Sequence, residues 1–169
     1  MKVLITGYRN YDRDDYVDSM FRSLQDGVRT SIGVIRLLSD VTVIHGGAPG
    51  ADTLGGRVAD KYGYQVRVFN ADWNQHGRAA GPIRNREMFK ALIDEDSNDI
   101  NPNILIAFHH RLMSSKGTKD MVQYALTGLS KIIHKTTVIL VWGNPMKGQY
   151  TELPIGCKLS NLQWAEVRI

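Results

Sequence analysis

The sequence predicts one α/β domain, with a Rossmann-like, doubly wound parallel sheet of about five strands and helices on both faces. Short apolar runs alternate with segments of helical periodicity, and glycines follow the ends of the first two runs. The predicted strands are apolar throughout, which is typical of a parallel sheet covered on both faces. A length of 169 residues suits a single domain over residues 1–169 that buries its core without disulfides.

The predicted elements follow one another along the chain. Residues 2–7 and 41–45 read as buried strands, and residues 15–38 and 51–62 carry apolar side chains at helical steps. Apolar and polar side chains alternate over residues 65–70, which predicts a third strand. A long polar loop follows it. The later predictions are a helix from Pro82 to about residue 94, a strand over 104–108, a helix over 118–129, a strand over 136–142 and a C-terminal edge strand over 163–169. The motifs fall in a core of residues 2–142, and residues 143–169 form a C-terminal extension.

Composition narrows the class of protein. The chain is 43% hydrophobic and 22% charged, as globular domains are. Apolar runs stay well short of the roughly 20 residues of a membrane helix, so we expect a cytoplasmic protein without membrane contact. A lone Cys157 excludes cysteine-rich zinc sites, and the histidines lack ligand spacing, so we expect no metal and no cofactor. The net charge of +4 suits anionic small ligands and nucleic acid equally.

The most informative motif is a glycine-rich turn over residues 45–52, where a strand leads into a helix. Amides at a helix N-terminus favour anions, and glycines let a phosphate approach the backbone closely. The turn therefore predicts ligand contacts through Gly46, Gly47, Ala48, Gly50 and Asp52. The alternative is a tight turn in which Asp52 only begins the helix. The pattern matches neither a Walker loop nor a dinucleotide fingerprint.

Two more loops follow strand ends. Gly7 and Arg9 come after the first strand, while the segment before the predicted helix 118–129 is rich in hydroxyls and holds Ser115, Lys116, Gly117 and Thr118. An ordinary helix cap is the alternative for the second loop. Since all parallel strands end on one side of a sheet, we expect these loops to meet the glycine-rich turn at a single crevice.

The polar loop after the third strand adds donors and an aromatic ring. Arg78, Arg84 and Asn85 offer donors for phosphate or carboxylate, and Trp73 offers a surface on which a base can stack. The alternatives are that Trp73 belongs to the core and that the arginines are solvated. The carboxylates near the crevice are candidate acids or bases, and the alternative for each is a helix cap or an acceptor for a ribose hydroxyl: Asp120, Asp52, Asp12 and Asp72.

Taken together, these motifs resemble the YspA-like branch of the SLOG superfamily. This Rossmann-like group includes the LOG phosphoribohydrolases and the nucleotide-binding core of DprA/Smf proteins. The matching stretches are residues 7–12, 45–52, 71–73, 76–85, 107–108 and 115–121. Such domains occur in bacteria and their phages. If the protein is encoded by a phage, the resemblance implies that it is located in the cytoplasm of the host.

The resemblance implies a nucleotide-like or sugar-phosphate ligand, such as an ADP-ribose derivative, and a homodimer or larger homo-oligomer. It leaves catalysis open. In LOG-type hydrolases the threonine of a Gly-Gly-x-Gly-Thr turn is followed three residues later by a catalytic glutamate. Here Met121 stands at that spacing from Thr118, and Asp120 comes one position early.

Three functions follow as hypotheses. The first is a sensor or sequestering protein that binds a nucleotide-derived ligand, because the anion loops converge while the glutamate is missing. The second is an N-glycosidic hydrolase of nucleoside phosphates, with Asp120, Asp52 or Asp12 as acid or base. The third is single-stranded nucleic-acid binding, which the pI of about 9.2 and the DprA/Smf resemblance favour but no motif supports.

Overall fold

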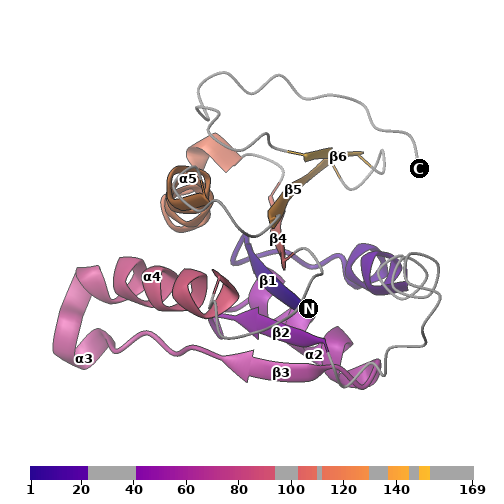
Figure 1. Cartoon of the computed structure of the whole chain (residues 1–169), viewed down its shortest axis with the longest axis horizontal. Helices are drawn as coiled ribbons and strands as arrows, with labels where there is room; N and C mark the ends of the chain where they lie inside the picture. Colours follow the sequence, from indigo (N-terminus) through magenta and orange to yellow (C-terminus); the bar gives the residue numbers. More distant parts are fainter. Residues whose placement is uncertain (23–40, 94–102, 110–111, 130–136, 145–148, 153–169) are drawn as a thin grey trace.

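A computed structural model describes residues 1–22, 41–93, 103–109, 112–129, 137–144 and 149–152 (Figure 1). Residues 14–22 are helical. The strands are β1 (Lys2–Gly7), β2 (Thr42–His45), β3 (Gln65–Val68), β4 (Asn103–Phe108), β5 (Thr137–Asn144) and β6 (Gln149–Glu152). The further helices are α2 (Ala51–Lys61), α3 (Trp73–His76), α4 (Ala80–Ile93) and α5 (Gly117–Leu129), with 3₁₀ turns η2 (Gly77–Ala79) and η3 (Leu112–Ser114).

The strands form one sheet in the order β3-β2-β1-β4-β5-β6. Neighbours from β3 to β5 pair in parallel, and β6 pairs with β5 antiparallel. The predicted α/β class with a Rossmann-like parallel sheet is therefore confirmed. The chain leaves β1 toward β2 on one side and returns to β4 on the other. The two halves of the sheet thus diverge at β1 and β4, the place where open α/β sheets bind ligands.

Two apolar layers cover the faces of the sheet. Successive residues of a strand point to opposite faces, and β1 shows this directly. Leu4 packs in one cluster with Met88 and Leu92 of α4, whereas Val3 and Ile5 belong to a second cluster with residues of α2. Helices on both faces thus hold the central strands in place and fix where their carboxyl ends emerge.

The segment after β3 differs from the predicted polar loop. Residues 73–79 form the helical turns α3 and η2, which run directly into α4. Asp72 initiates α3, because its carboxylate accepts the backbone N–H of Gln75 at 2.9 Å. The turns are too short for apolar periodicity to reveal them, so only the Asp72 cap marked them in the sequence.

Strand β3 departs from the prediction that the strands are covered on both faces. All four of its residues are exposed, with Val66 at 36% and Val68 at 47%. Its position at the edge of the sheet explains this, since only β2 flanks it. The predicted edge strand over residues 163–169 and the helix beyond residue 22 lie outside the described residues. Among the described helices, none has the length and apolar character needed to cross a membrane.

Candidate functional site

A cavity of about 680 Å³ opens at the carboxyl ends of the central strands. Its volume lies within the range of small-molecule sites. The structure brings most of the sequence-predicted binding residues onto its wall: Gly7, Arg9, Ala48, Asp52, Trp73, Arg78, Arg84, Asn85, Ser115, Lys116, Gly117 and Thr118. Gly46, Gly47 and Gly50 are not part of the wall. Contact of any of these residues with a ligand stays a prediction.

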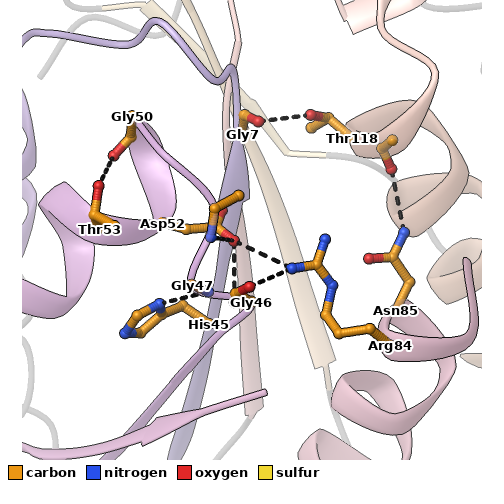
Figure 2. Close-up of polar contacts among 12 residues, drawn as sticks. Gly7, His45, Gly46, Gly47, Gly50, Asp52, Thr53, Arg84, Asn85 and Thr118 are labelled. Carbon is orange, nitrogen blue, oxygen red and sulfur yellow. Dashed lines mark hydrogen bonds and ion pairs between the residues drawn. The ribbon is translucent and has the colours of Figure 1, made fainter. Parts of the chain in front are cut away.

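Backbone contacts hold the loops of the cavity together. Tyr8 donates its N–H to the carbonyl of Phe108 at 2.9 Å and so joins the ends of β1 and β4. The Thr118 hydroxyl donates to the carbonyl of Gly7, also at 2.9 Å (Figure 2). A Cβ on Gly7 would lie 2.5 Å from both Ala51 Cβ and the Phe108 carbonyl oxygen, which explains the glycine. The start of α5 is thereby fixed against β1.

The glycine-rich turn donates its amides to its own side chains. Gly46 and Ala48 donate their N–H groups to Oδ2 of Asp52 at 3.0 and 3.4 Å. Gly47 donates to Nδ1 of His45 at 3.1 Å (Figure 2). The anion that this turn holds is thus the Asp52 carboxylate. Phosphate binding through these same amides would require Asp52 to move.

Arg84 faces Asp52 across the floor of the cavity. Its Nη1 lies 3.9 Å from Asp52 Oδ2 and donates to the carbonyl of Gly46 (Figure 2). A Cβ on Gly46 would overlap this guanidinium, so glycine is required for the contact. The Arg84 Nε is buried and has no hydrogen-bond partner in the described residues. The alternative of a solvated Arg84 is therefore excluded, since the side chain is only 14% exposed.

Burial dominates the titration of this group of residues. It raises the pKa of Asp52 to about 6, although the Arg84 charge and the amides of Ala48 and Gly46 oppose the rise. Burial and then the Arg84 charge lower the pKa of His45. His45 is therefore neutral, and the Gly47 bond to Nδ1 places its proton on Nε2. The cavity thus contains a carboxyl group that exchanges a proton near neutral pH.

Asp120 is a different kind of carboxylate. Arg86 binds it with two nitrogens, at 2.6 and 3.0 Å, and Asn85 donates to it at 2.9 Å. Burial acts to raise the pKa of Asp120, but the bonds from Arg86 and Asn85 outweigh it and the net shift is downward. Asp120 is thus an ionised, paired group that joins α4 to α5.

The structure also tests the alternatives for the remaining candidate residues. Trp73 is 52% exposed and lines the cavity, so it is not part of the core. Ser115 accepts the N–H of Thr118 at 3.1 Å, which is the helix cap considered as an alternative. Asp12 is exposed and lies off the cavity wall. Among the described residues, no three His, Cys, Asp or Glu side chains are grouped to hold a metal ion.

His109 and Arg86 are among the residues that sequence reasoning did not select. His109 lines the cavity, is 4% exposed and meets the Tyr8 ring edge-on at 5.2 Å. Its position directly after β4 was a usable signal, because the same rule selected Arg9 after β1. Arg86 lies off the wall but neutralises Asp120. Its role follows from the packing of α4 on α5, which no local pattern reveals.

Comparison with known proteins found a matching family model and a phage relative. The family model described as "YspA, cpYpsA-related SLOG family" matches residues 1–76. The Gene 61 protein of Mycobacterium phage D29 is 38% identical over 101 residues, which cover 55% of this chain and 71% of the phage protein. No solved structure gives a significant match. The matched family segment contains β1, the glycine-rich turn, Asp52 and Trp73, and the chain belongs to the YspA, cpYpsA-related SLOG family.

Proposed function

We propose that this protein binds a nucleotide-derived ligand in the cavity at the ends of β1 and β4, as a sensor or sequestering protein. The observation that carries the proposal is the combination on one wall of an exposed indole, Trp73, with cationic side chains. A nucleotide needs these two kinds of contact, because its base stacks on aromatic rings and its phosphates pair with arginine and lysine. Family membership supports a ligand-binding role of this type.

Thermal unfolding with AMP, ADP and ADP-ribose at millimolar concentration tests the proposal. A ligand that binds the folded state raises the melting temperature by mass action. We expect a rise with at least one of these compounds, and a smaller rise in Trp73→Ala. Val66→Ala is the matched control, because it also removes an exposed apolar side chain but lies off the cavity wall. No rise with any compound would contradict the proposal.

Sensing or sequestration further predicts that the ligand is released intact. Mass spectrometry of the small molecules that are released when the natively purified protein is denatured identifies the bound ligand directly. A stoichiometric, intact nucleotide derivative is the expected result. Recovery of a free base with ribose phosphate would instead indicate turnover.

A second candidate function rests on Asp52. A carboxyl group with a pKa of about 6 in a ligand-sized cavity suits general acid–base chemistry. Hydrolysis of an N-glycosidic bond would add water across that bond and release a base and a ribose phosphate. Incubation with nucleoside monophosphates, followed by chromatography, tests this candidate. Loss of product in Asp52→Asn but not in Asp60→Asn, an exposed aspartate of the same helix, would support it.

A further inference from the structure

The charges on the cavity wall do not balance. Both carboxylates of the wall already face a cation: Asp52 lies 3.9 Å from Arg84, and Asp120 binds Arg86, which is not part of the wall. Each carboxylate is therefore balanced by one cation, although the Arg9 charge also acts on Asp52 and lowers its pKa. Any further cation on the wall is excess charge.

Three cations of the wall are in excess. Arg9, Arg78 and Lys116 are exposed, and none of their charged side-chain groups makes a hydrogen bond or ion pair with the described residues. Like charges around one concave surface repel one another and concentrate a positive potential inside it. An anionic ligand removes that repulsion.

The three side chains come from different parts of the sheet. Arg9 and Lys116 follow β1 and β4, which are neighbours, whereas Arg78 lies in η2 after β3. Strand β3 is two positions away from β1, or about 10 Å at the usual strand spacing. Trp73 precedes Arg78 on the same segment. The three cationic side chains therefore line the cavity from two sides.

We infer that the cavity selects a ligand with two phosphoryl groups over a ligand with one. One phosphoryl group would pair with Arg9 and Lys116, and the second would pair with Arg78. The inference rests on the proposed nucleotide-binding function and narrows its ligand to the diphosphate class. A nucleoside diphosphate and free pyrophosphate share this chemistry, so the test includes both.

Isothermal titration with AMP, ADP and pyrophosphate at low salt measures the selectivity. We expect ADP to bind at least about tenfold more tightly than AMP, since phosphate contacts by arginine are charge-assisted. Arg78→Ala should lower ADP affinity to near that of AMP and leave AMP affinity within about twofold. Lys119→Ala is the control for removal of a positive charge, because Lys119 lies off the wall.

The outcomes separate the two proposals. Equal affinity for AMP and ADP, or an equal effect of Arg78→Ala on both, would overturn the inference while nucleotide binding stands. Pyrophosphate that binds as tightly as ADP would support the diphosphate class but contradict a contribution from the base. Absence of binding by all three compounds would overturn the inference. If ADP-ribose also fails to raise the melting temperature, the proposed function is contradicted as well.

Discussion

Arg84 and Asp52 face each other at 3.9 Å on the floor of the cavity, with side chains that are only 14% and 5% exposed. The distance makes this a through-space ion pair rather than a hydrogen bond. Asp52 takes its hydrogen bonds from the turn amides, and Arg84 gives one to Gly46. The glycine-rich turn, the start of α2 and the start of α4 are thereby coupled through two side chains.

Arg84→Met should destabilise the protein more at pH 8 than at pH 5. At pH 8 Asp52 is ionised and loses its buried counter-charge, whereas at pH 5 it is largely protonated and needs none. We expect the loss in the free energy of unfolding at pH 8 to exceed the loss at pH 5 by about 2 kcal/mol. This difference is smaller than the usual cost of breaking a buried ion pair whose groups are in contact. Urea unfolding at both pH values checks this. Equal losses would show that Arg84 does not act on the Asp52 charge.

Asp52→Asn should flatten the pH dependence of stability. Burial raises the folded-state pKa of Asp52 from 3.8 to about 6, so the folded state binds the proton more tightly than the unfolded chain. The contribution of Asp52 to the free energy of unfolding is therefore fully present below about pH 4 and is lost as the pH rises through 6. At about 1.4 kcal/mol per pKa unit, the loss amounts to about 3 kcal/mol. Asparagine does not titrate.

Urea titrations of wild type and Asp52→Asn at pH 4, 5, 6 and 7.5 measure the difference. The variant should gain stability relative to wild type across this interval. Parallel curves would mean that the Asp52 pKa is the same in the folded and unfolded states. Asp60→Asn, on the exposed face of α2, controls for charge removal.

Local patterns were enough to predict the fold class and most of the cavity wall. The runs of β1, β2 and β4 are apolar and continuous, and the common direction of parallel strands brings Arg9 and Lys116 to one cavity. The partners of the charged groups could not be predicted. That Asp52 accepts from its own turn, and that Arg86 pairs with Asp120 across two helices, depends on tertiary packing. Short α3 likewise lacks a periodic signal.

Arg86→Lys should weaken the link between α4 and α5. Arg86 binds Asp120 with two nitrogens and lies over the Tyr124 ring at 4.1 Å, and lysine reproduces neither geometry. Because both charged groups are about a third exposed, we expect a modest loss of about 1 kcal/mol in urea unfolding at pH 7. Asp14→Asn, which breaks an exposed pair with Arg57, should leave the midpoint unchanged. An equal effect of both variants would contradict a structural role for the Arg86 pair.

Gly50→Ala should cost much more stability than Gly63→Ala, although both glycines have a φ of 77°. An alanine at either site costs at least about 1 kcal/mol for the positive φ, and the cost is larger at Gly50, whose ψ of −123° lies outside the left-handed region open to other residues. At Gly63 nothing lies within 4 Å of the added atom, so the backbone cost stands alone. At Gly50 the atom would meet the carbonyl oxygens of Tyr8 and Arg9, backbone groups that pack the β1 loop against the turn. Urea unfolding of both variants measures the combined backbone and packing cost at Gly50, and equal losses would show that the turn and the β1 loop adjust freely. The same displacement would shift Arg9, so Gly50→Ala should also weaken ADP binding, while Gly63→Ala should not.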